Sequence, residues 1–157
     1  MGEPTAQDAA FLERAVAEAQ RGASEGGVPV GSVLVVDGRV VGAGRNRSMQ
    51  LGSVIRHAET DALENAGLLP VEAYRRATLY TTLSPCCMCA GAILWYRIGR
   101  VVVGDSQTFR GAETLLEGHG VELVRLESAI CGDLLTAFIE RHQEHWDAIA
   151  FGADPCG

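Results

Sequence analysis

The N-terminal third of the chain shows one helical pattern and two strand patterns. Apolar residues recur every three or four positions over residues 5–22, which predicts an amphipathic helix that begins near Thr5 and ends at Gly22. The members of this stripe are Phe11, Leu12, Ala15, Val16 and Ala19. A loop over 22–29 leads to two apolar runs, 30–36 and 39–44, on either side of Asp37-Gly38. An Asp-Gly pair between such runs predicts a β-hairpin with a two-residue turn.

The rest of the chain alternates between helix and strand patterns. Short runs rich in β-branched and other apolar residues predict three further strands, at 77–83, 100–104 and 121–126. A polar loop is expected over 45–55. Helices are expected at 57–66 (closed by Gly67), from Pro85 to about Tyr96, at 112–118, from Ser128 to Ile139 and from Glu144 to Phe151.

This order of elements predicts the fold class. A hairpin followed by strands that alternate with helices favours an α/β fold, here a three-layer α/β/α sandwich with a mixed five-stranded sheet. A chain of 157 residues fits one domain. The nearest candidate for a linker, 67–76, is too short and too apolar to divide it. We therefore expect a single domain over 1–157.

Charge and composition limit the classes of partner. The chain carries 20 acidic residues against 13 basic ones, all of them Arg, for a net charge of -7. Binders of structured nucleic acid usually present a clustered basic surface, so we expect a small-molecule substrate and no stable nucleic-acid partner. The N-terminus lacks a signal-peptide pattern, and no apolar run approaches the ~20 residues that span a bilayer. A cytoplasmic protein without a membrane partner is expected.

The chain concentrates sulfur in the segment LSPCCMCAG at 83–91. Cys86 and Cys89 are three residues apart at a predicted helix start, so both thiolates can reach one ion, and the helix N-terminus favours their ionised forms. Cys87 lies about 100° around the helix and is expected to be a small buried residue or a bystander. A single C-x-x-C also occurs as a redox pair or by chance. The sequence holds no second C-x-x-C, which argues against a closed site of four cysteines.

A second element, RHAETDAL at 56–63, carries His57 and Glu59 at another predicted helix start. His57 with Cys86 and Cys89 makes three zinc ligands, the number that leaves a fourth position open in catalytic zinc sites. Zinc lowers the pKa of a coordinated water to about 7, and Glu59 is close enough in sequence to shuttle protons. The alternatives are a core histidine, a helix-capping acid, and a structural zinc or redox module without hydrolytic activity.

These two elements resemble a known family. HAE at 57–59 followed by PCCMC at 85–89 fits H-x-E…P-C-x-x-C, the signature of zinc-dependent nucleobase deaminases. The flanking segments EGGVPVGSVLV, LYTTLSPCCMCAGAI, RVVVG and HGVELV, with Phe109, look like the fungal type of cytosine deaminase, which acts on the free base. The resemblance covers nearly the whole chain. It implies a cytidine deaminase-like fold, one Zn²⁺ per chain, a homodimer, and release of ammonia as C–NH₂ becomes C=O.

The resemblance also implies roles for individual residues. His57, Cys86 and Cys89 would hold zinc, and Glu59 would carry protons from water to the ring nitrogen and the leaving amine. The family's base-orienting Asn corresponds to Asn46, in GAGRNRS. The remaining implied contacts are the Ser84 carbonyl to the amino group, and Phe109 and Trp146 around the flat ring. From the residues alone, Asn46 can also be a turn residue, and both aromatic rings can be plain core.

One position departs from the fungal pattern. Those enzymes have an Asp three residues after the C-terminal Trp, where this chain has Ile149, while Asp147 directly follows Trp146. Asp147 is expected to replace the missing contact if the last turn shifts, and otherwise to be a surface acid. Loss of a buried polar partner changes specificity, so cytosine, isocytosine and an amino-s-triazine are all candidate substrates. A tRNA adenosine deaminase and a guanine deaminase are the alternatives within the superfamily.

Overall fold

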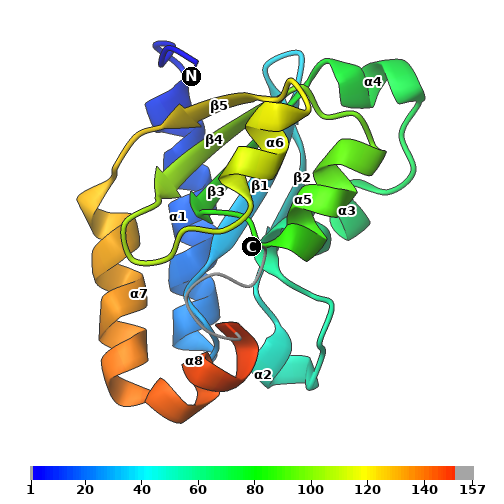
Figure 1. Ribbon diagram of the computed structural model, residues 1–157. Coiled ribbons are helices and arrows are strands. Elements are labelled where there is room, and N and C mark those ends of the chain that lie inside the picture. Colours follow the sequence, from blue (N-terminus) through cyan, green and yellow to red (C-terminus); the bar gives the residue numbers. More distant parts are fainter. Residues whose placement is uncertain (1, 151–157) are drawn as a thin grey trace.

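The computed structural model describes residues 2–150 and is built around a five-stranded sheet (Figure 1). The strands lie in the order β2-β1-β3-β4-β5. Their bounds are β1 Gly31–Val36, β2 Arg39–Arg45, β3 Ala77–Leu83, β4 Arg100–Asp105 and β5 Glu122–Arg125. β1 pairs antiparallel with β2 and β3, whereas β3–β4 and β4–β5 are parallel pairs. The sheet is therefore mixed, as the sequence predicts.

The expected hairpin joins β1 to β2. Asp37 has φ 49° and Gly38 has φ 75°, and positive φ at both central residues is the signature of the turn type that matches strand twist. Val36 and Arg39 are paired directly across this turn. The local sequence signal and the observed backbone therefore agree.

Helices cover both faces of the sheet and complete the three layers (Figure 1). One face packs on α1 (Asp8–Ser24) and α7 (Ala129–Arg141), and the other on α3 (Ala58–Ala66), α5 (Cys87–Trp95) and α6 (Glu113–Gly118). Successive residues of β1 face opposite sides of the sheet. Val33 and Val35 pack in the core on the side of α1 and α7, whereas Leu34 and Val36 pack in the core on the side of α3, α5 and α6. None of the helices that the structure describes is long and apolar enough to cross a bilayer.

Several boundaries differ from those expected. The first helix continues past Gly22 to Ser24, because Gly22 is buried against the Val28 carbonyl and the Arg45 side chain rather than ending the helix. The short helix α2 (Ser48–Leu51) lies in a segment that was expected to be a loop, and α4 (Val71–Arg75) lies in 67–76, where no element was expected. α5 begins at Cys87, so Pro85 precedes the helix. The last helix, α8, runs over Gln143–Ala150, and its expected end at Phe151 lies outside the described residues.

The topology brings three loops to one edge of the sheet. β2 and β3 run in the same direction because both are antiparallel to β1, and β4 is parallel to β3. The carboxyl ends of β2, β3 and β4 therefore share an edge, as in other α/β sheets where ligands bind beyond these ends. Asn46 follows β2, Ser84 follows β3, and the loop to Phe109 follows β4. Residues far apart in the sequence meet there.

Candidate active site

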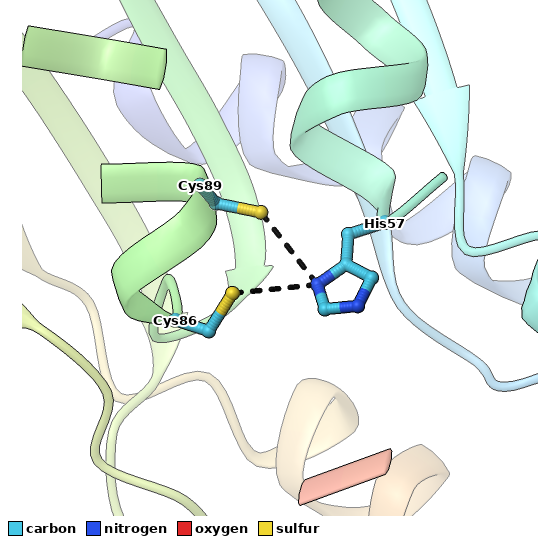
Figure 2. Close-up of side chains that lie close together, drawn as sticks. All are labelled: His57, Cys86 and Cys89. Carbon is cyan, nitrogen blue, oxygen red and sulfur yellow. Dashed lines mark hydrogen bonds between the residues drawn. The ribbon is translucent and has the colours of Figure 1, made fainter. Parts of the chain in front are cut away.

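Three metal-binding side chains meet where α3 and α5 begin (Figure 2). The Sγ atoms of Cys86 and Cys89 lie 3.4 Å and 3.6 Å from Nδ1 of His57. All three ligand atoms lie within 4.8 Å of one another. Tetrahedral zinc with bonds of about 2.0–2.3 Å holds its ligand atoms roughly 3.5 Å apart. Two sulfurs and one imidazole nitrogen at these spacings fit a zinc ion with an open fourth position.

The two helix starts explain this geometry. His57 and Cys86 are the residues that precede α3 and α5, both with extended backbone, and Cys89 lies in the first turn of α5. The hydrogen bond from Cys89, assisted by His57, lowers the pKa of Cys86 to about 4 in spite of burial. The same interaction and burial raise the pKa of Cys89 well above its ordinary value. Zinc ligation therefore requires a proton to leave Cys89, since thiolates are the ligands.

Glu59 lies beside this metal group, in the first turn of α3. Its side chain is buried, with Oε1 accepting a hydrogen bond from the Thr81 hydroxyl at 3.0 Å and Oε2 accepting one from Cys89 Sγ at 3.3 Å. Burial raises the pKa of Glu59, and the negative charge of Cys86 adds to the effect. A carboxyl group with a raised pKa is suited to accept and return a proton near neutral pH. Sequence reasoning missed Thr81, because β3 also carries Thr78 and Thr82 and nothing in the sequence singles out one of the three hydroxyls.

A cavity opens next to the metal group. Its polar wall is formed by Asn46, His57, Glu59, Ser84 and Cys86. Its apolar wall is formed by Val28, Val30, Ala58, Leu83, Phe109, Trp146, Ile149 and Ala150. One wall can thus bind and react with polar ring atoms while the other encloses a flat apolar body.

Asn46 lines this cavity and is also part of a turn, so both interpretations of the sequence apply to it. Its main-chain N–H donates to the Val30 carbonyl at 3.0 Å. Its Oδ1 accepts hydrogen bonds from the N–H and the hydroxyl of Ser48, at 3.0 Å and 2.8 Å. Because Ser48 occupies the amide oxygen, Nδ2 is the donor that Asn46 can offer to a ligand.

Ser84 is held rigidly between β4 and the loop that follows it. Its N–H donates to the Asp105 carbonyl at 2.9 Å, and its Oγ accepts from the Gly111 N–H at 2.9 Å. Gly111 is required at this approach, because a Cβ there would collide with the Pro85 carbonyl. These contacts engage the Ser84 N–H and Oγ, so its carbonyl is the group that remains for a ligand.

Phe109 and Trp146 close the apolar side of the cavity. Their ring centroids are 5.9 Å apart, and the planes are nearly perpendicular at 89°. Ile149 lines the cavity together with them, as expected for a residue three positions after Trp146 on the same helix. Asp147 does not line this cavity: its side chain is exposed and accepts a hydrogen bond from Gln143 at 2.8 Å. The expectation that Asp147 replaces the missing acid is therefore dropped, because residue 147 points to another face of α8.

One further expectation needs correction. Cys87 is exposed, so of its two expected roles the buried one is wrong and the bystander remains. The rings of His142 and His145 lie against Phe138, with His142 at a centroid distance of 4.8 Å. His145 Nε2 also lies 3.4 Å from the Ser48 hydroxyl, next to Asn46. Cys131 is buried under the sheet, and Cys156 lies outside the described residues.

Comparison with known proteins agrees with this site. Residues 5–105 match the family model described as the cytidine and deoxycytidylate deaminase zinc-binding region. The chain is 46% identical over 144 residues to a cytosine deaminase of Candida albicans, covering 91% of this chain and 96% of the relative. It is 34% identical over 146 residues to a tRNA-specific adenosine deaminase of Streptococcus pyogenes, covering 85% and 91%. The matched family region contains the metal group, Asn46 and Ser84, and ends before Phe109.

Solved structures show the same architecture. A structure from work on A-to-I editing by tRNA:A34 deaminases superposes with a TM-score of 0.70 at 32% identity, over 81% of this chain and 99% of that one. A guanine deaminase from Bacillus subtilis superposes with a TM-score of 0.55 at 33% identity, over 73% and 70%. The metal-binding residues, their spacing and the family match lead to one conclusion: the chain belongs to the zinc-dependent cytidine and deoxycytidylate deaminase family.

Proposed function

We propose that this protein is a zinc-dependent hydrolase that deaminates a free, cytosine-like amino-heterocycle and releases ammonia. The observation that carries the proposal is the cavity, which brings a two-cysteine, one-histidine metal group, a buried carboxyl group and two hydrogen-bonding residues into one small space. The identity of 46% with a cytosine deaminase over most of both chains supports it. One zinc ion per chain follows from the single group of ligands found among the described residues.

The chemistry divides between the metal and the chain's own residues. Zinc on His57, Cys86 and Cys89 supplies a Lewis acid that activates water at neutral pH. Glu59 takes a proton from water and delivers protons to the ring nitrogen and to the leaving amine. The Thr81 hydroxyl holds one oxygen of Glu59 in place. The overall reaction is balanced, because water and the C–NH₂ group become C=O and ammonia.

Orientation of the ring is assigned to the cavity walls. Asn46 offers its amide N–H to a ring acceptor, and the Ser84 carbonyl accepts from the amino group that leaves. Phe109 and Trp146 flank the flat ring. Ile149 offers no hydrogen bond, so the chain has fewer polar contacts with which to reject related rings. Cytosine is the first candidate substrate, followed by isocytosine and amino-s-triazines.

Ammonia release across a panel of rings tests this proposal. The panel contains cytosine, 5-substituted cytosines, isocytosine, guanine, adenine, creatinine and amino-triazines, each assayed with the zinc-loaded protein. We expect turnover on a cytosine-like ring and none with the Glu59→Ala variant. Absence of ammonia from every ring would contradict the proposal.

A tRNA adenosine deaminase is the second candidate, favoured by the 34% identity with such enzymes over 85% of this chain. The net charge of -7 counts against it, because RNA binding relies on basic contacts to phosphates. Inosine formation in tRNA, measured beside ammonia release from cytosine, separates the two. Inosine without cytosine turnover would reverse the order of the candidates.

We also propose the homodimer and the cytoplasmic location that the family resemblance implies. Trp95 and Tyr96 are neighbours at the C-terminal end of α5, but their surroundings differ. Tyr96 stacks on Tyr74 at a centroid distance of 4.8 Å, whereas Trp95 is 80% exposed at the end of α5. Trp is enriched in the cores of protein–protein interfaces, so a Trp that is exposed in the single chain favours an interface at this place. Sedimentation equilibrium of the parent and of Trp95→Ser tests the dimer, which the substitution should weaken.

A further inference from the structure

Asp61 is a fully buried carboxylate on α3, one turn after His57. Its Oδ2 accepts a hydrogen bond from the Arg45 main-chain N–H at 3.1 Å, and its Oδ1 accepts one from Nη1 of Arg56 at 3.0 Å. Nε of Arg47 lies 3.3 Å from Oδ2. A charge without solvent is tolerated only when it is paired and hydrogen-bonded. The Arg45 N–H and the Arg56 guanidinium supply the hydrogen bonds, and Arg56 and Arg47 supply the positive charge. Asp61 does not line the cavity.

The partners of Asp61 flank the two ends of the segment 48–55. Arg45 and Arg47 are the neighbours of Asn46, and Arg56 is the neighbour of His57. The Arg47 N–H also donates to the Arg56 carbonyl at 2.9 Å, which closes the base of the segment between them. Four residues of this segment, Met49, Leu51, Val54 and Ile55, have exposed apolar side chains. Asn46 is therefore held both by Ser48 inside the segment and by the contacts that close its base.

β2 and α3 approach each other closely at the same point. Gly44, just before Arg45, faces the backbone of Asp61 and Ala62, and an added Cβ would collide with it. Gly42 faces the Ala62 carbonyl in the same way. The strand that leads to Asn46 thus lies directly on the helix that follows His57, and Asp61 is the charged group at this contact.

We propose that Asp61 is a positioning residue that fixes the Asn46 amide relative to the zinc ligand His57, and so sets the orientation of the substrate ring. The proposal rests on the proposed function, because it assigns ring binding to Asn46. Asp61 acts through the backbone of Arg45 and the side chains of Arg47 and Arg56, and does not touch the ring. Loss of its charge weakens the contacts that hold Arg45 and Arg47, on either side of Asn46, and Arg56, which precedes His57.

The Asp61→Asn variant tests this role, because it keeps the size of the side chain and one acceptor but removes the charge. We expect kcat/KM on the best ring to fall roughly 10- to 100-fold, since misplacement by about 1 Å can cost on the order of 100-fold. The loss should appear mainly in KM, as expected when a contact to bound substrate is lost. Zinc content should match the parent. The matched control is Glu64→Gln on the same helix, whose exposed carboxylate lies 4.0 Å from Arg56, and it should behave as the parent.

A double-mutant cycle separates positioning from general destabilisation. If Asp61 acts through Asn46, adding Asp61→Asn to the Asn46→Ala variant should cost less than about threefold further. Equal losses in both backgrounds, or zinc loss in proportion to activity, would overturn the proposal. If Asp61→Asn does not fold, Arg56→Gln is the substitute, because it removes one partner of Asp61 at a part-exposed position. The loss caused by Arg56→Gln should then also be smaller in the Asn46→Ala background than in the parent. A parent inactive on every ring contradicts the proposed function, whereas an active parent with additive losses contradicts the role of Asp61 alone.

Discussion

The hydroxyl of Thr81 donates to Oε1 of Glu59 at 3.0 Å, and both side chains are buried. Thr81 lies on the central strand β3, and Glu59 lies on α3. The hydrogen bond therefore fixes the carboxyl group of the helix against the rigid sheet. A carboxyl group that moves protons must keep its orientation through the reaction, because proton transfer needs hydrogen-bond distance. Thr81 supplies this constraint without contacting the metal group.

Thr81→Val should lower kcat roughly 10- to 100-fold. The substitution keeps the shape of the side chain but leaves a buried carboxyl oxygen without its donor, and a hydrogen bond to such a group contributes about 1.5–3 kcal/mol. Steady-state kinetics measure the effect, with zinc content as a check. Thr81→Ser keeps the hydroxyl and should retain most of the activity. Equal activity of Val and Ser variants would remove Thr81 from the site.

Glu59→Ala should retain zinc and lose turnover. The three zinc ligands are His57, Cys86 and Cys89, so removal of Glu59 leaves the metal in place while the proton carrier is lost. General acid–base groups contribute about 10²- to 10⁴-fold. Ammonia release and metal content of the purified variant are the two measurements. Full deaminase activity in this variant would rule out the assigned mechanism.

The three clustered cysteines should respond differently to substitution by Ser. Cys86→Ser and Cys89→Ser each remove a sulfur that lies within 3.6 Å of the His57 imidazole, so both variants should be purified with little zinc. Cys87 is exposed, and Cys87→Ser should keep the full metal content. Elemental analysis of the three proteins decides the matter. Zinc loss in Cys87→Ser would mean that the ligands are assigned to the wrong face of α5.

Ile149→Asp should change the choice of ring. It places a carboxylate in a cavity wall that is now apolar at this position, and a hydrogen bond to a charged group contributes about 1.5–3 kcal/mol. We expect the ratio of kcat/KM values to shift by roughly tenfold or more toward rings that present an N–H at that edge. The control is Asp147→Asn, whose side chain is exposed and bonded to Gln143 and which should leave the ratio unchanged. A shift caused by Asp147→Asn would restore that residue to the site.

Acidic pH should lower the stability of the folded protein, because it protonates Asp8. Burial acts to raise the pKa of Asp8, but hydrogen bonds from Arg100, the Thr5 N–H and the Tyr80 hydroxyl outweigh it and hold the pKa well below its ordinary value. A depressed pKa in the folded state stabilises the protein above the unfolded pKa of about 3.9, and this contribution is lost as pH falls further. Urea unfolding should therefore show lower stability at pH 3 than at pH 6.

The Asp8→Asn variant isolates this group. It should cost about 3 kcal/mol at pH 6, because it leaves Arg100 without its buried partner, and it should flatten the fall in stability toward pH 3. Asp37→Asn is the matched control, because the Asp37–Arg76 pair is exposed and such pairs contribute at most about 1 kcal/mol. An acid response as steep as that of the parent would show that another carboxylate governs it.

Local patterns determined a large part of this protein. Asp37-Gly38 predicts the hairpin because few other residue pairs tolerate positive φ at both turn positions. The alternation of strand and helix signals predicts the mixed sheet. The spacing of His57 and Glu59, and that of Cys86 and Cys89, predicts the metal group, because each pair lies at the start of one helix. The proximity of these two helix starts to each other depends on the tertiary structure, and the α/β topology brings them together.

Tertiary contacts decided the rest. Gly22 stays inside α1 because it is buried against Val28 and Arg45, a preference that helix-end statistics do not contain. Thr81 and Asp61 acquire their roles from partners on other elements, and nothing in their own neighbourhoods in the sequence marks them. Ile149 rather than Asp147 lines the cavity because α8 is docked with one face toward Phe109. The sequence by itself determined which chemistry the chain carries, and the docking of distant elements decided which residues orient it, because orientation depends on contacts that no short segment can encode.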